Sequence, residues 1–322
     1  METASRTLVA GYNLHNVLRR GAVVLVVLVA LRSLTATAQP QAFIKFDGTP
    51  GNYVQIDDPS TADFSVNPGV GLTVSAWIRP DALHFDHTDG SDPNQQYVHW
   101  LGKGEGSDDN AQQEWTFRIY SQNEPIPCDA CPRLNRVSFY VFNLARPPGV
   151  VCQNEGIGSY FQYPINDPDP LVAGDWIHVV GVVDDSEGIK TTSIYKNGNF
   201  VRCDRYQATG VAGCQRLPDQ APGQCPRPII PTHGSAAVRI GHRDRLSYLN
   251  GAIAEVRIWN RPLSADEVAA VYQGGDPAPD ALLMGQYLLD ETGGDTTAHD
   301  TSDNPTGPHD GRVLGSTWMW GP

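Results

Sequence analysis

The chain has 322 residues, of which 40% are hydrophobic and 18% are charged, and this composition excludes a disordered tail and a small disulfide scaffold. Its 32 glycines and 25 prolines favour many turns, which excludes a helical bundle and a coiled coil. The formal net charge of -13 disfavours nucleic acid and anionic lipid surfaces as partners, because their phosphate groups would on balance be repelled.

The first 38 residues have the pattern of a secretory signal peptide. Arg19 and Arg20 precede an apolar run over residues 21–31, and residues 35–38 supply the small side chains after which signal peptidases cut. The apolar run is too short to cross a hydrocarbon core of about 30 Å. We therefore expect residues 1–38 to be a signal peptide, and the rest to be secreted or held at the cell surface without a transmembrane span. The alternative is an uncleaved anchor, because Arg32 is atypical of a leader.

Short segments in which apolar and polar residues alternate dominate the rest of the chain, and this period of two is typical of β-strands. Residues 72–78 place Leu, Val, Ala and Ile on one face, whereas residues 176–183 are apolar on both faces, as in a central strand. Asn197-Gly198 predicts a hairpin between residues 191–195 and 200–202, because a type I′ turn needs positive φ at both central positions. Further strands are predicted over residues 43–46, 53–56, 97–101, 115–120, 136–142, 237–240, 252–259, 285–289 and 312–314. So many short strands predict an all-β sandwich of two sheets.

One short surface helix is predicted after residue 263. Ser264 and Glu267 form a capping box, in which each side chain satisfies a free amide of the first turn. Val268, Val271 and Tyr272 then give a short apolar stripe. Gly274 can end the helix in the left-handed conformation.

The six cysteines all follow the predicted leader. In an oxidising compartment they would form up to three disulfides whose pairing the sequence does not determine. The alternative is a metal site at the Cys-x-x-Cys motif of Cys128 and Cys131, but no second pair with zinc spacing follows. The disulfide candidates are Cys128, Cys131, Cys152, Cys203, Cys214 and Cys225.

Four ordered blocks, over residues 46–56, 72–80, 176–198 and 251–264, resemble the bacterial LamG-like jelly-roll family of the concanavalin A-like lectin/glucanase superfamily. The resemblance implies a jelly-roll sandwich of two antiparallel sheets, without enzymatic activity, in an exported protein that binds glycans or other surfaces. In many relatives a segment like residues 283–313 comes first, whereas here it comes last. Either segment 281–322 closes a single domain of residues 39–322, or it begins an incomplete second repeat, and we favour closure because an open sandwich exposes strand edges.

No catalytic motif is found in the sequence. Glucanases of this superfamily carry Glu-x-Asp-x-x-Glu on one strand, because glycoside cleavage needs two opposed carboxylates, and this spacing is absent. A Gly-x-Ser-x-Gly elbow, a His-Glu-x-x-His pair and a P-loop are absent as well. We expect a protein that is not an enzyme. The alternatives are a divergent or accessory glycan-cleaving enzyme on the same fold and a structural cell-envelope component.

The resemblance also implies a structural Ca²⁺ ion, since residues 300–311 resemble the family's Asp-x-Ser-Gly-Asn loop and Ca²⁺ prefers carboxylate and carbonyl oxygens. The candidate metal ligands are Asp300, Asn304, Asp310, Glu255 and Asp47. Ala254 stands where the family commonly has Asp, and this departure puts full coordination in doubt. The alternative is that these acids only solvate a loop.

Exposed aromatic rings that stack on sugars are the expected ligand contacts, because a pyranose ring packs its apolar face on an aromatic ring. The candidate ligand-binding residues are Trp100, Trp115, Tyr160, Tyr163 and Tyr248. Each could instead be packed in the core. The sequence thus predicts a secreted, calcium-associated, non-catalytic binding or adhesion module with a glycan or another cell-surface ligand as partner.

Overall fold

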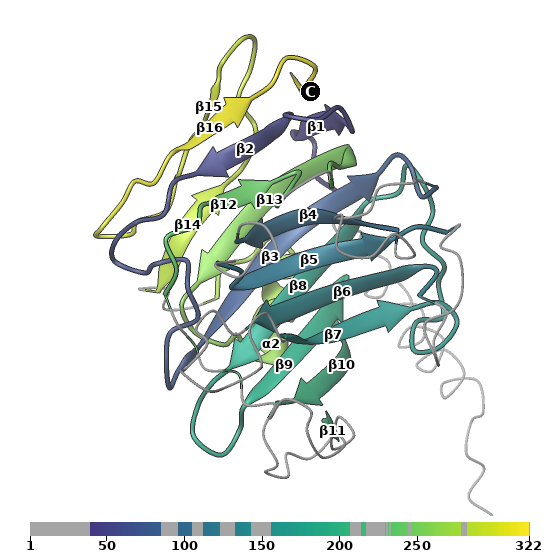
Figure 1. The fold of residues 1–322 in the computed structure, drawn as a ribbon, viewed down its shortest axis with the longest axis vertical. Helices are drawn as coiled ribbons and strands as arrows, with labels where there is room; N and C mark the ends of the chain where they lie inside the picture. The colour runs from purple at the N-terminus through teal and green to yellow at the C-terminus, as the bar shows by residue number, and fades with distance from the viewer. Residues whose placement is uncertain are drawn as a thin grey trace, which may run out of the picture. The chain divides into compact units, whose positions relative to one another are not determined.

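The computed structural model describes residues 39–84, 96–104, 112–122, 133–142, 156–206, 214–216, 229, 231, 233–243, 247–277 and 282–321. Residues 39–322 group into one compact unit, and the predicted signal peptide lies outside the described residues. The fold is an all-β jelly-roll sandwich of two sheets with one helix in the described part, as predicted (Figure 1). No helix among these residues is long and apolar enough to cross a membrane.

The first sheet contains nine strands in the described part of the chain. In spatial order they are β11 (Gln215–Arg216), β10 (Asn199–Arg205), β9 (Thr191–Lys196), β8 (Ile177–Asp184), β3 (Gly71–Pro80), β13 (Asn250–Trp259), β1 (Ile44–Asp47) and β17 (Met319–Trp320), with β14 (Leu283–Tyr287) also paired to β13. Its strand pairs are antiparallel except for the short pair of β10 and β11. β8 lies between β3 and β9, which confirms the prediction of a central strand.

The second sheet contains eight strands in the same described ranges. In spatial order they are β15 (Thr297–Ala298), β16 (Gly311–Leu314), β2 (Tyr53–Ile56), β12 (Val238–Ile240), β4 (Tyr97–Lys103), β5 (Trp115–Tyr120), β6 (Arg136–Phe142) and β7 (Gly156–Gln162). Four strands of the two sheets, β7, β11, β15 and β17, were not predicted from the sequence.

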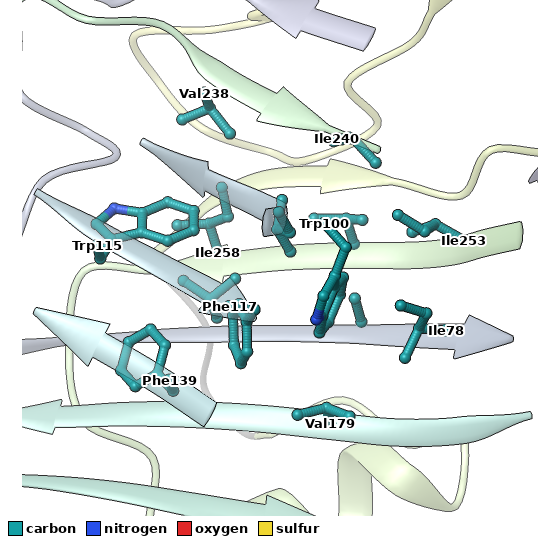
Figure 2. Close-up of a cluster of buried hydrophobic side chains, with 14 of the residues drawn as sticks. Ile78, Trp100, Trp115, Phe117, Phe139, Val179, Val238, Ile240, Ile253 and Ile258 are labelled. Atoms are coloured by element: carbon teal, nitrogen blue, oxygen red, sulfur yellow. The ribbon is translucent and has the colours of Figure 1, made fainter. Parts of the chain in front are cut away.

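The main core lies between the sheets and is rich in aromatic rings (Figure 2). The ring of Phe117 lies 4.8 Å from those of both Trp100 and Phe139, between centroids. The even-numbered apolar residues of β3 pack from the other sheet, as the alternation predicted. Burial of these rings is the main stabilising contribution to the sandwich.

Helix α2 (Ala265–Tyr272) covers the outer face of the first sheet. Its capping box is formed as predicted, with the Ser264 side chain bonded to the Glu267 amide and the Glu267 carboxylate bonded to the Ser264 amide. Val268 and Val271 are buried in a second apolar cluster, whose other members are Val180, Val182, Tyr195, Trp259 and Leu263. This cover explains why β8 is apolar on both faces.

The hairpin between β9 and β10 turns at the predicted dipeptide. Asn197 has φ of 50° and Gly198 has φ of 74°, in agreement with a type I′ turn. A Cβ atom at Gly198 would also lie 2.8 Å from the ring of Tyr272. The glycine is therefore required both by the turn and by the helix that packs over it.

Two of the strands that follow α2 pair with the first strands of the fold, one in each sheet. β16 pairs with β2, with Val313 opposite Val54. β17 pairs with β1, with Trp320 opposite Ile44. The two ends of the described chain thus lie side by side, and β1 and β2 are each covered on both edges.

Candidate functional site

A pocket of about 420 Å³ lies where β1 and β3 end and β13 begins, and we call it the rim pocket. Its floor is formed by Val98, Ile119 and Leu249, which are buried apolar side chains of the sandwich core. Its polar lining comes from Asp47, Thr49, His84, Tyr248 and Asn250. The rim pocket therefore combines an apolar base with hydrogen-bonding groups around it.

Asp47 supplies the charge of the rim pocket. One of its oxygens accepts hydrogen bonds from the Thr49 amide at 2.9 Å and from the Asn52 side chain at 3.1 Å. Burial raises the pKa of Asp47, but hydrogen bonds from Thr49, Thr317 and Asn52 outweigh this effect and lower it below its ordinary value. Asp47 is an exposed, ionised acceptor at neutral pH.

Asn250 and Tyr248 stand beside this carboxylate. Asp47 lies opposite Asn250 in the pairing of β1 with β13, so an acid and an amide from neighbouring strands meet at one point. Tyr248 is partly buried, and its ring stacks at 4.2 Å on His242, which covers one of its faces. His242 in turn has Nδ1 2.8 Å from the carbonyl of Ser247, and this contact holds the aromatic pair in place.

This arrangement is suited to holding a polar ligand with an apolar face. Pockets of about 300–1,000 Å³ that combine an apolar base with a few polar groups are typical small-molecule sites. Glycoside cleavage would need two carboxylates across the scissile bond. Asp47 is the one acid among the described lining residues, which therefore do not supply such a pair.

The rim pocket contains two of the predicted site residues, although they were predicted for different roles. Asp47 was a candidate metal ligand and Tyr248 a candidate sugar contact. Asn250, Thr49 and His84 were missed in these roles. The blocks around β1 and β13 were recognised in the sequence, but nothing local indicates that their ends meet.

The predicted metal loop is held by hydrogen bonds. Asp300 is 8% exposed, and its carboxylate accepts from the amides of Gln286 and Ser302 at 3.0 Å and of His309 at 2.9 Å. Asp310 accepts from the Asp300 amide at 2.9 Å. Asp300 and Asp310 therefore lie together, and backbone amides donate to both oxygens of Asp300 and to one oxygen of Asp310.

Asn304 belongs to a neighbouring group that we call the Asp63 cluster, formed by Asp63, Asn304, Thr306 and His309. The Asp63 carboxylate receives the Asn304 side chain at 3.0 Å, His309 Nε2 at 2.9 Å and the Thr306 hydroxyl. Burial raises the pKa of Asp63, but the hydrogen bonds from Thr306, Asn304 and His309 lower it overall. The cluster ties the loop before β3 to the loop before β16.

Ca²⁺ binding by the predicted ligands stays a prediction, and the structure shows where each of them lies. Asp47 and Glu255 lie on β1 and β13, whereas Asp300, Asn304 and Asp310 lie in the loop between β15 and β16. The described ranges also contain no group of three or more His, Cys, Asp or Glu side chains that could hold a metal ion. Ca²⁺ needs six to eight oxygen ligands, and backbone amides already donate to both oxygens of Asp300.

Trp100 and Trp115 do not lie on a binding surface, and the prediction that they contact a ligand is wrong. Both are fully buried in the main core, and the Trp115 indole donates to the Phe64 carbonyl at 2.8 Å. Tyr163 is 38% exposed in the turn after β7, outside the rim pocket. Tyr160 lies on β7, on the face of the second sheet that points away from the core.

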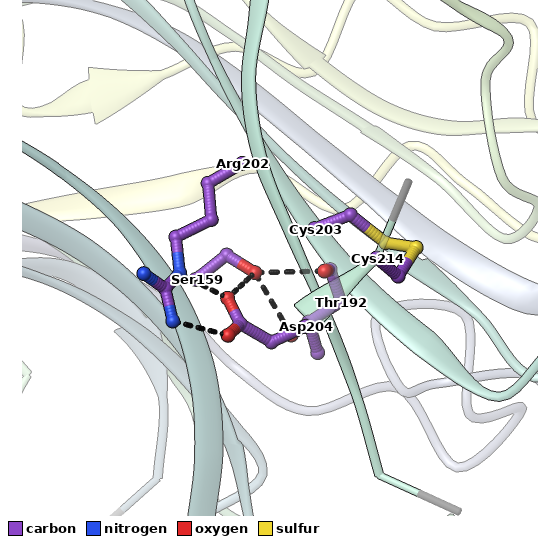
Figure 3. Close-up of a disulfide and its surroundings, with 6 residues drawn as sticks. All are labelled: Ser159, Thr192, Arg202, Cys203, Asp204 and Cys214. Carbon is purple, nitrogen blue, oxygen red and sulfur yellow. Dashed lines mark hydrogen bonds and ion pairs between the residues drawn. A yellow bond between two sulfur atoms is a disulfide. The ribbon is translucent and has the colours of Figure 1, made fainter. Parts of the chain in front are cut away.

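One of the predicted disulfides falls within the described residues, between Cys203 and Cys214 (Figure 3). It ties β10 to the residue before β11. Next to it, the buried Asp204 carboxylate accepts from Ser159 at 2.7 Å and from Arg202 Nε at 2.6 Å, which links β10 to β7. The other four cysteines, Cys128, Cys131, Cys152 and Cys225, lie outside the described residues.

No protein-family profile and no curated protein matches this sequence. Among solved structures, the chain is similar to a candidate carbohydrate-binding protein from Bacteroides ovatus at 15% identity and a TM-score of 0.48, covering 88% of this chain and 60% of that one. It is similar to a SAP-like pentraxin from Limulus polyphemus at 13% identity and a TM-score of 0.46, covering 88% and 95%. It is also similar to the binding domain of botulinum neurotoxin serotype G at 12% identity and a TM-score of 0.43, covering 72% and 42%. The chain thus spans less than two thirds of the Bacteroides protein and of the toxin chain, and at these identities the likeness concerns the arrangement of the strands.

Proposed function

We propose that the protein is a non-catalytic glycan-binding module and that its ligand occupies the rim pocket. The observation that carries this proposal is the meeting of the Asp47 carboxylate, the Asn250 amide and the Tyr248 ring above an apolar floor. Sugars present hydroxyl groups on their edges and C–H groups on their faces. Such a ligand matches a pocket that has acceptors and donors on its rim and apolar side chains at its base.

The setting of this module is an exported protein of the LamG-like kind. The signal-peptide pattern of residues 1–38 and the resemblance of the four sequence blocks support this part of the proposal. The disulfide between Cys203 and Cys214 supports it as well, because disulfides persist mainly in oxidising compartments.

A glycan array of neutral oligosaccharides, followed by calorimetry on the best ligand, tests the binding site. Tyr248→Ala and Asn250→Ala should each weaken binding by about tenfold, because each removes a ring contact or a hydrogen bond. Tyr163→Ala is the matched control, since it removes an exposed tyrosine outside the rim pocket and should leave the affinity unchanged. The proposal fails if no array glycan binds, or if the two pocket variants bind as tightly as the parent. Release of reducing sugar from a bound glycan would overturn its non-catalytic part.

Calcium association remains a prediction from the sequence resemblance. Melting curves in Ca²⁺ and in chelator decide it, because a bound ion stabilises the folded state by mass action. A melting temperature that rises with Ca²⁺ concentration would support the ion. Identical curves would mean that the hydrogen bonds of Asp300 and the Asp63 cluster hold the loop alone.

A further inference from the structure

Arginine and tyrosine side chains alternate across the outer face of the second sheet. On β4 to β7 the core side chains are Trp100, Phe117, Phe139 and Phe161. Residues of the opposite parity point away from the core. Those that form this surface, which we call the arginine–tyrosine face, are Tyr97, Arg118, Tyr120, Arg136, Tyr140 and Tyr160.

The first row of this face crosses β4, β5 and β6. The guanidinium carbon of Arg118 lies 4.9 Å from the ring centre of Tyr97 and 4.8 Å from that of Tyr140. Its Nε donates to His99 Nε2 at 2.8 Å. Arg118 and Tyr140 are both partly exposed, whereas Tyr97 and His99 beside them are buried.

The second row crosses β5, β6 and β7, and its Arg136 lies two residues along β6 from Ser138, the residue opposite Arg118. The guanidinium carbon of Arg136 lies 3.9 Å from the ring centre of Tyr160 and 5.9 Å from that of Tyr120. Its Nε donates to the side-chain oxygen of Gln162 at 2.9 Å. Arg202 of β10 covers Tyr160 at 4.2 Å.

The charges of Arg118 and Arg136 have no carboxylate partner among the described residues. Three other buried or half-buried cations are each paired with a carboxylate: Arg202 with Asp204 at 2.5 Å, Lys196 with Asp167 at 2.6 Å and Lys103 with Glu114 at 2.5 Å. Arg136 is 6% exposed, and an unpaired buried charge is costly. Contacts with aromatic faces offset only part of this cost.

The described side chains of this face thus carry positive charge, in a chain whose formal net charge is -13. Burial raises the pKa of Tyr120, but the neighbouring Arg118, Arg133 and Arg136 lower it overall. The same field would stabilise a bound anion. The net negative charge of the chain excludes long polyanions such as nucleic acid as favoured occupants.

We propose that the arginine–tyrosine face binds the anionic group of an acidic sugar residue, a carboxylate or a sulfate, between Arg118 and Arg136. Guanidinium groups bind both anions through paired hydrogen bonds, and the partly exposed ring of Tyr140 can pack against the sugar. The site is separate from the rim pocket, whose floor residues Val98 and Ile119 lie on the core side of the same strands.

Calorimetry with the full protein tests the proposal with three probes: tetragalacturonic acid, its fully methyl-esterified form and a sulfated neutral tetrasaccharide. We expect the acid to bind about tenfold or more tightly than its ester, because the ester lacks the charge. Binding should also weaken when the salt concentration rises from about 0.05 to about 0.5 M. A preference for the sulfated probe would identify sulfate as the anionic group. The proposal is overturned if the acid and its ester bind with equal affinity, or if neither the acid nor the sulfated probe binds. These measurements need only the parent protein.

Arg118→Gln and Arg136→Gln should each reduce the affinity for the acidic probe by about tenfold. Arg312→Gln is the matched control, because Arg312 is an exposed arginine of β16 that pairs with Asp57 and lies outside the arginine–tyrosine face. Arg136→Lys keeps the charge and should retain part of the affinity for the acidic probe. It replaces Arg136→Gln in the test if that variant does not fold. Folded variants that bind the acid as the parent does would refute the site.

These outcomes are separable from those of the rim pocket. Loss of neutral-glycan binding in Tyr248→Ala with intact acid binding concerns the rim pocket alone. Loss of acid binding in Arg118→Gln with intact neutral-glycan binding concerns the arginine–tyrosine face alone.

Discussion

Lys103 at the end of β4 offers a sharp test of how the interior tolerates charge. Its side chain is fully buried, and Nζ lies 2.5 Å from Glu114 Oε1 and 2.8 Å from Asp58 Oδ1. The ammonium group also donates to the carbonyls of Gly234 at 2.5 Å and of Ala236 at 2.9 Å. We consider Lys103→Met, which keeps the length of the side chain and removes the charge.

The expected loss is about 3–5 kcal/mol at neutral pH, the usual cost of removing one partner of a buried ion pair. Burial raises the pKa of Glu114, while Lys103 counteracts this effect. The variant should therefore raise the pKa of Glu114 further. A carboxyl whose folded pKa exceeds its unfolded value loses stability as pH rises above that unfolded value, here about 4.5. The deficit of the variant should therefore be small near pH 4.5 and grow toward neutrality.

Equilibrium urea unfolding of parent and variant at several pH values measures this deficit. Lys45→Met is the control, because its surface ion pair with Asp81 should contribute only about 0–1 kcal/mol. The double variant Lys103→Met/Glu114→Gln should regain part of the loss, since it removes the stranded carboxylate. A loss below about 1 kcal/mol at neutral pH, or one that does not change with pH, would refute the reasoning.

Three further outcomes follow from the described contacts. Trp100→Ala should lower the free energy of unfolding by about 3–5 kcal/mol in urea titrations, as expected for a buried aromatic ring, and leave glycan affinity unchanged. The double variant Cys203→Ser/Cys214→Ser should lose about 3 kcal/mol in the same assay, because the disulfide closes a loop with a sequence separation of 11; an unchanged unfolding midpoint would contradict this. The pKa of Asp63 is lower in the folded protein than its unfolded value of 3.8. The Asp63 carboxylate therefore stabilises the fold above pH 3.8, and this stabilisation is lost as the pH falls through the folded pKa. The midpoint of acid unfolding should accordingly move to higher pH in Asp63→Asn. An unchanged midpoint would show that the Asp63 cluster does not contribute to the free energy of unfolding.

The strands that the sequence revealed are those whose alternation is strong. Apolar residues recur at a period of two in β3 and β13, and β8 is a run that is apolar on both faces. The Asn197-Gly198 dipeptide favours the positive φ angles of a type I′ turn. β7 reads Gly-Ile-Gly-Ser-Tyr-Phe-Gln and has weak intrinsic strand preference. It forms because seven consecutive residues pair with β6, a long-range contact that no local pattern contains.

The side to which a ring points was harder to predict than the strand that carries it. β4 is buried along its whole length, and its pairing with β5 shifts register between His99 and Leu101. Alternation alone therefore could not indicate that Trp100 faces the core.

The groups that make up the sites come from distant parts of the chain. Asp63 and Asn304 are 241 residues apart, and a local sequence pattern cannot reveal their contact. Arg118 and Arg136 looked like ordinary polar positions of two strands. Their shared face depends on the register of β5 with β6, which only the folded sheet defines.

The pairing of β17 with β1 and of β16 with β2 has a consequence for biosynthesis. The earliest strands to leave a ribosome must wait for the last ones before their edges are satisfied, so closing the loop between them carries a large entropic cost and slows folding. A truncated copy that lacks β16 and β17 would display open strand edges, and these are templates for aggregation with a neighbouring copy.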